Sequence, residues 1–153
     1  MAKAIPDGFN TLTPHIIVQD ATRAIDFYKK AFGAQEQTRH LAPDGKTVMH
    51  AQLKIGNSVL MLANEFPPTA VSPKARGGTS VTLHIYVENV DAAFDRAVKA
   101  GCTVKMPLSD QFWGDRYGQL EDPFGHVWSI ATHKVDLTEQ QIAENAKAAF
   151  ARM

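Results

Sequence analysis

The chain contains one pattern twice, and this internal repeat constrains its fold more than any other feature. The segment LTPHIIVQDATRAID at 12–26 aligns with VTLHIYVENVDAAFD at 81–95, and six of the fifteen positions are identical. A second stretch, QLKIGNSVLML at 52–62, aligns with QLEDPFGHVWSI at 119–130 once one residue is inserted. A repeat of this length predicts two copies of one structural unit that bury their apolar faces together.

Each copy has the pattern of a strand, a helix and three further strands. The helical stretches carry apolar residues at helical spacing and end at Gly33 and Gly101, and turn residues separate the later strands. The fold class is therefore α+β, with two tandem βαβββ modules. We expect strands at 12–19, 34–41, 47–55 and 58–63 in the first copy, and at 80–88, 103–107, 115–121 and 126–132 in the second.

The 153 residues allow a single domain with two halves. Module one covers about 9–64, and module two covers about 80–133. A stretch rich in Pro and Gly at about 65–79 is the expected linker. A C-terminal helix is expected at about 138–153, because Thr138 and Gln141 form a capping-box pattern and apolar residues follow at helical spacing.

Charge and cysteine content exclude several classes of partner. Lys plus Arg and Asp plus Glu both number 16, so the formal net charge is zero, and the basic residues form no stripe for nucleic acid or cationic face for a membrane. The single cysteine, Cys102, suits a reducing compartment and is expected to be buried. No signal peptide or membrane-spanning run is visible, so a cytoplasmic protein is expected.

Four motifs carry a family resemblance. They are AIDFYKKAFGA at 24–34, IGNSVLML at 55–62, FWGDRYG at 112–118 and EDPFGHVW at 121–128. With the duplicated βαβββ unit, they resemble the vicinal oxygen chelate superfamily of glyoxalases, bleomycin resistance proteins and dioxygenases, and FWGDRYG resembles its PhnB-like branch. The resemblance implies that the sheets form a cup around a small-molecule ligand, and that chains pair as homodimers.

The resemblance also implies where a metal would be held. The positions that match the metal ligands of the family's enzymes are Thr13, Met61, Thr82 and Ser129, which line the expected cup but are weak ligands for a divalent metal. The expectation is therefore no cofactor. A divalent metal would instead require His15 and His84, with a third ligand among His50, Gln52 and His133.

His15 and His84 are equivalent across the repeat and lie two residues beyond Thr13 and Thr82. Since side chains alternate along a strand, all four share one face of the sheets. Two interpretations of the histidines remain open at this point. Either they contact a ligand in the cup, or they are hydrogen-bonded core residues.

The segment QFWGDRYG at 111–118 gathers aromatic and charged residues that could bind a ligand. We expect Trp113, Arg116 and Tyr117 at the rim of the cup, where aromatic rings and a guanidinium could bind a ligand. The alternative is a loop whose Asp115–Arg116 turn lies in solvent. Among the remaining candidates, the pattern predicts a buried Trp128, strand-edge histidines at His50 and His133, exposed His40 and His126, and solvated Glu121 and Asp122.

Three functions are compatible with these features. The first is a metal-independent small-molecule binding protein of the bleomycin-resistance type. The alternative is a divalent-metal-dependent lyase or dioxygenase of the glyoxalase type. A third is metal-free lyase or isomerase chemistry with a histidine as base. Whether the protein is an enzyme therefore stays open, as does the identity of the ligand.

Overall fold

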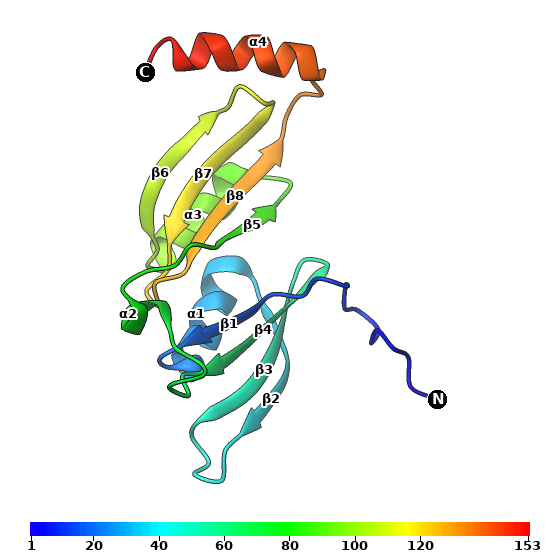
Figure 1. Cartoon of the computed structure of the whole chain (residues 1–153), viewed down its shortest axis with the longest axis vertical. Coiled ribbons are helices and arrows are strands. Elements are labelled where there is room, and N and C mark those ends of the chain that lie inside the picture. The colour runs from blue at the N-terminus through cyan, green and yellow to red at the C-terminus, as the bar shows by residue number, and fades with distance from the viewer.

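The protein consists of two βαβββ modules and a C-terminal helix, which confirms the predicted fold class (Figure 1). The computed structural model describes residues 1–153. The elements are β1 (His15–Val18), α1 (Ala21–Phe32), β2 (Gln35–Leu41), β3 (Val48–Ile55), β4 (Ser58–Asn64), α2 (Pro73–Arg76), β5 (Thr82–Tyr86), α3 (Val90–Ala100), β6 (Thr103–Asp110), β7 (Asp115–Glu121), β8 (Val127–His133) and α4 (Glu139–Phe150).

The two sheets have equivalent strand orders, β1-β4-β3-β2 and β5-β8-β7-β6. In each, the first strand pairs in parallel with the last, and the other pairings are antiparallel. His15 lies opposite Met61, and His84 lies opposite Ser129, so the repeat is preserved in the register. No strand pairing joins the two sheets, and each is a separate half with free edges at its first strand.

Helices α1 and α3 cover one face of the sheets and contact each other between the modules. The cap residues explain their boundaries. Asp20 accepts a hydrogen bond from the backbone N–H of Arg23, and Asn89 accepts one from that of Ala92. Gly33 ends α1 at a φ of 67°, which favours glycine. In Figure 1 both helices lie behind the sheets, so the opposite sheet faces carry no helix.

Asp122 joins the two modules and corrects the prediction that it is solvated. It is 2% exposed. Its carboxylate accepts hydrogen bonds from the Tyr28 hydroxyl of α1 at 2.6 Å and from the Trp128 indole N–H at 2.9 Å. The backbone N–H groups of Phe124 and His126 donate to its other oxygen at 2.8 and 3.0 Å. Trp128 is buried as predicted, in the same core as Tyr28.

The C-terminal helix α4 forms as expected, with the capping box of Thr138 and Gln141. It lies across the far end of module two in Figure 1, and none of its residues is buried. Phe150 is 63% exposed, and its ring lies 6.1 Å from that of Phe112 in module two. None of the helices has both the length and the apolar character that crossing a membrane requires.

Candidate functional site

The uncovered face of the second sheet gathers polar and aromatic side chains. Strand alternation places them there: the register sets His84 beside Ser129, Ser129 beside Gln119, and Asp115 beside His133. The intervening residues, such as Trp128 and Leu120, point to the helices and are buried. We call this surface the module-two face and define it by His84, Tyr86, Asp115, Tyr117, Gln119, Ser129 and His133.

Aromatic rings form a row across the module-two face. The His84 ring stacks on Tyr117 with centroids 5.9 Å apart and meets Tyr86 edge to face at 4.6 Å. Trp113, in the connection before β7, packs edge to face against Tyr117 at 5.4 Å. The Tyr117 hydroxyl accepts a hydrogen bond from the Gln119 amide at 2.7 Å. Such a row offers flat apolar surface together with hydrogen-bonding groups.

One nitrogen of His84 is occupied and the other is not. Nδ1 lies 2.6 Å from the Ser129 hydroxyl, which is itself 2% exposed. No hydrogen bond engages Nε2, and the residue is exposed. Partial burial lowers the pKa of His84 below 6.5, although Asp115 opposes this shift. The imidazole is therefore predominantly neutral at pH 7 and presents one free hydrogen-bonding nitrogen.

Asp115 is 3% exposed, so it does not form a turn in solvent. Its carboxylate accepts a hydrogen bond from the Tyr86 hydroxyl at 2.8 Å and lies 2.7 Å from His133 Nδ1. Burial alone, the largest influence, raises the pKa of Asp115. Hydrogen bonds from His133, Tyr86 and Trp113 outweigh burial and hold this pKa below its ordinary value. Asp115 is thus a buried carboxylate that holds Tyr86 of the aromatic row in place.

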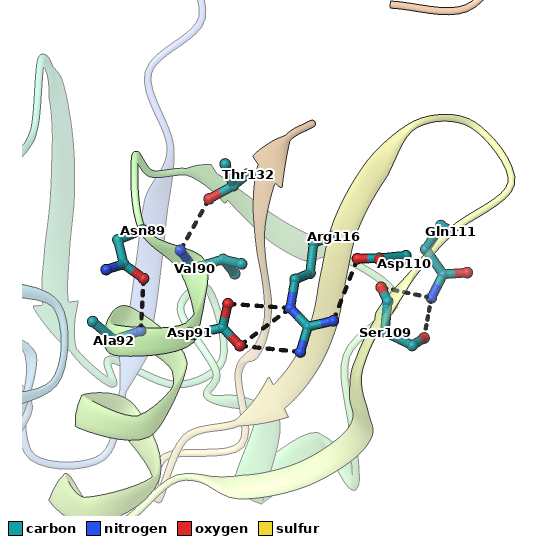
Figure 2. A network of polar contacts seen from close by, with 9 residues as sticks. All are labelled: Asn89, Val90, Asp91, Ala92, Ser109, Asp110, Gln111, Arg116 and Thr132. Carbon is teal, nitrogen blue, oxygen red and sulfur yellow. Dashed lines mark hydrogen bonds and ion pairs between the residues drawn. The ribbon is translucent and has the colours of Figure 1, made fainter. Parts of the chain in front are cut away.

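Arg116 lies on the opposite side of the sheet from its neighbours Asp115 and Tyr117. Figure 2 shows its guanidinium between Asp91 of α3 and Asp110 of β6, with nitrogen–oxygen distances of 3.0 and 3.3 Å. Both partners raise its pKa, Asp91 more strongly. The structure therefore brings Trp113 and Tyr117 to the module-two face but not Arg116, whose charge is engaged by two carboxylates.

The remaining predicted residues lie on module one or between the modules. His15 and Met61 are cross-strand neighbours on the uncovered face of the first sheet. His15 stacks on His50 at 5.7 Å, so His50 is an inner-strand residue and not the edge residue expected. Burial, followed by the nearby His50, lowers the pKa of His15.

A cavity of about 950 Å³ separates the modules along the free edge of β5. Thr13, Thr82 and His84 line it together, with the β3–β4 turn on the far wall. His15 lines a different, smaller cavity. His15 and His84 therefore do not face one cavity within a single chain. His84 and Tyr86 border both the large cavity and the module-two face.

Several residues of the site escape sequence reasoning. The same period of two that relates Thr82 to His84 also reaches Tyr86, so Tyr86 could have been found. Gln119 follows Tyr117 at the same spacing, and the sequence indicates His133 only as a candidate metal ligand or a strand-edge residue. His126, expected to be exposed, is 9% exposed, and its Nε2 lies 2.8 Å from the Ile17 carbonyl oxygen. His40 is exposed, and Cys102 is buried, with burial raising the pKa of its thiol to about 12.

The residues at the family's metal positions do not form a suitable donor set. The Thr13 hydroxyl donates to the Asn10 carbonyl oxygen at 2.9 Å, and the Ser129 hydroxyl is engaged by His84. Met61 offers only a thioether, a soft ligand that suits oxygen-binding divalent metals poorly. No group of three or more His, Cys, Asp or Glu side chains comes together as a metal site. We therefore derive no chemistry through a metal.

The chain belongs to the Glyoxalase/Bleomycin resistance protein/Dioxygenase superfamily, whose sequence profile matches residues 8–130. This confirms the family resemblance found in the sequence. An uncharacterised protein of Mycobacterium tuberculosis, Rv0887c, is 46% identical over 142 residues, which cover 89% of this chain and 83% of the relative.

Solved structures have the same fold and include a PhnB protein. TioX from Micromonospora sp. ML1 is 30% identical, with a TM-score of 0.64, over 84% of this chain and all of TioX. The fosfomycin resistance protein FosX from Listeria monocytogenes is 17% identical, with a TM-score of 0.62, over 88% of this chain and 96% of FosX. FosX was crystallised with Mn(II) and a dihydroxypropylphosphonic acid, so metal use occurs within the superfamily.

Proposed function

We propose that this protein binds a small, planar, uncharged molecule on the module-two face and does so without a metal. The observation that carries the proposal is the row of Trp113, Tyr117, His84 and Tyr86 with its one free imidazole nitrogen. Aromatic rings stack on a planar ligand, and neutral His84 can donate to or accept from a carbonyl or hydroxyl group. The bleomycin resistance proteins of the superfamily give a precedent for small-molecule binding.

The charges of the site favour an uncharged ligand over an anion. The residues that define the module-two face include no Lys or Arg, and Arg116 is turned away and paired with Asp91 and Asp110. Asp115 is ionised and matched by His133. A phosphonate or carboxylate would therefore lose hydration against this face without gaining a free cationic partner, and a desolvated unpaired charge is penalised by roughly several kcal/mol.

We propose that a second copy of the chain completes the site as a homodimer. Both sheets leave one face uncovered, the edges at β1 and β5 are free, and Tyr86 on the module-two face is 62% exposed. The apolar side chains of α4 are at most half-buried. Pairing of two chains would bury these surfaces and shield a bound ligand from water. A cytoplasmic location is part of the proposal, since the only cysteine is a buried thiol.

A thermal-shift screen of uncharged planar aromatic compounds, repeated on three variants, tests the binding proposal. Trp113→Ala and His84→Ala should weaken binding of the hits by about tenfold or more, as loss of a stacking or hydrogen-bonding contact does. The control His40→Ala alters an exposed histidine of module one and should leave affinity unchanged. If Trp113→Ala and His84→Ala retain wild-type affinity for every hit, the ligand does not bind this face.

A further inference from the structure

A line of polar contacts at one end of the module-two face has no role in the binding proposed above. Asp115 Oδ1 lies 2.7 Å from His133 Nδ1, and Asp115 Oδ2 accepts from the Tyr86 hydroxyl. On its far side, His133 Nε2 lies 2.7 Å from Asp136 Oδ1. The pair of Asp115 and His133 lies two residues along the strands from the pair of Tyr117 and Ala131, and is the next pair on the same face. This imidazole therefore lies beside the aromatic row.

The contact of His133 with Asp115 is more stable than its contact with Asp136. Asp115 is buried and also accepts from the Tyr86 hydroxyl, so it fixes both the orientation of the His133 ring and the hydrogen on Nδ1. Asp136 is a fully exposed side chain in the segment that leads to α4. An ion pair at such a position contributes little in water and can be displaced. Displacement of Asp136 would leave Nε2 of an oriented imidazole facing outward.

We propose that His133 is a proton-transfer residue, oriented by Asp115 and covered by Asp136, that acts on an acidic C–H or O–H of a neutral planar molecule. This inference rests on the proposed function, because it requires the molecule to lie on the module-two face. Asp115 is a positioning residue that does not itself exchange the proton. A buried carboxylate bonded to one imidazole nitrogen prepares the other nitrogen for general acid–base catalysis.

The protonation states of the two histidines on this face are complementary. Asp115 and then Asp136 raise the pKa of His133 above 6.5, whereas burial lowers that of His84. The groups that face His133 are Asp115 on β7 and Asp136 after β8, and Tyr86 on β5 reaches it through Asp115. The same face thus carries one imidazole whose pKa is shifted upward and one whose pKa is shifted downward. Titratable groups shifted in opposite directions are typical of acid–base sites.

Base-promoted opening of nitrobenzisoxazole is a suitable probe, because the compound is planar and uncharged. His133 Nε2 takes the proton from the ring carbon next to nitrogen. The electron pair of that C–H bond forms the nitrile, the N–O bond breaks, and the oxygen leaves as a coloured phenolate. The proton on His133 then passes to the buffer. The reaction is an isomerisation followed by ionisation, and it needs no oxidant, reductant or metal.

The wild-type protein should open the probe on the order of a hundredfold faster than the same concentration of free imidazole, as positioned general bases do. His133→Gln should remove this acceleration. Asp136→Asn should increase the rate at neutral pH and move the midpoint of the pH–rate profile to lower pH, because a carboxylate that raises the His133 pKa is lost. The control His40→Gln removes an exposed histidine of module one and should leave the rate unchanged.

The result that overturns the inference is a rate at the level of free imidazole in both the wild-type protein and Asp136→Asn, or full activity in His133→Gln. Tyr86→Phe gives a milder variant than any change at buried Asp115, and it should alter the pH profile without abolishing the rate. Binding is followed separately by quenching of tryptophan fluorescence, to which Trp113 and the buried Trp128 both contribute. Binding without proton transfer would refute this inference alone, whereas loss of binding to wild-type protein would refute the proposed function as well.

Discussion

Asp122 gives the sharpest prediction about stability, because its buried carboxylate connects the modules. Four donors converge on it, from Tyr28, Trp128 and two backbone N–H groups of the turn before β8. Hydrogen bonds to a charged group contribute about 1.5–3 kcal/mol each, and a buried donor left without a partner costs about 1–3 kcal/mol. The four share one carboxylate and are not additive, so Asp122→Ala should lower the free energy of unfolding by about 4 kcal/mol. Asp122→Asn keeps an acceptor and should cost about half as much.

Urea unfolding followed by circular dichroism measures both losses. Asp95→Asn is the matched control, since this α3 carboxylate is 60% exposed and pairs only with Lys99. It should change stability by no more than about 0.5 kcal/mol. A loss below about 1 kcal/mol in Asp122→Ala would mean that the carboxylate is not the partner of the buried donors.

Three further predictions concern the site and the assembly. Ligand binding should be full above pH 6.5 and weaken as the pH falls through the lowered pKa of His84, because the neutral imidazole is the binding form. The His84→Gln variant should lose this pH dependence of affinity. An unchanged pH profile in that variant would contradict the role assigned to His84. Gly114→Ala should displace the segment after β8, because Gly114 has a φ of 102° and a Cβ there would meet the Val135 carbonyl oxygen. Amide hydrogen exchange at 134–137 should therefore rise. Gly45→Ala, with open space around its Cβ, should not affect that segment. Removal of residues 137–153 should shift the proposed homodimer toward monomer in sedimentation at micromolar concentration, and an unchanged assembly would exclude α4 from the interface.

The layout of the fold is predictable from the sequence because its signals are local. Apolar periodicity and helix-stop glycines define the elements, and the repeat shows that they occur twice. Buried polar residues are harder to predict from the sequence. Asp122 looks solvated beside a turn, and only the contact with Tyr28, 94 positions away, makes it a buried anchor. His126 becomes buried by a similar distant contact with Ile17.

The candidate site was predictable in part for the same reason. Alternation identified His84, and the aromatic content of 111–118 identified Trp113 and Tyr117. Arg116 was grouped with them by its chemistry, but alternation along the correctly predicted strand at 115–121 turns it toward the helices. The Asp115–His133 pair depends on the register between β7 and β8, which a single sequence does not specify.

The central claim is that the module-two face binds an uncharged planar molecule without a metal. Isothermal titration calorimetry tests this claim most directly. The tightest hit from the screen is titrated with and without a chelator, and a carboxylate-bearing analogue of that hit is measured alongside. We expect equal affinity with and without chelator, and an analogue that binds at least about tenfold more weakly because no free cation meets its charge. Binding that disappears with chelator, or an anionic analogue that binds more tightly, would contradict it.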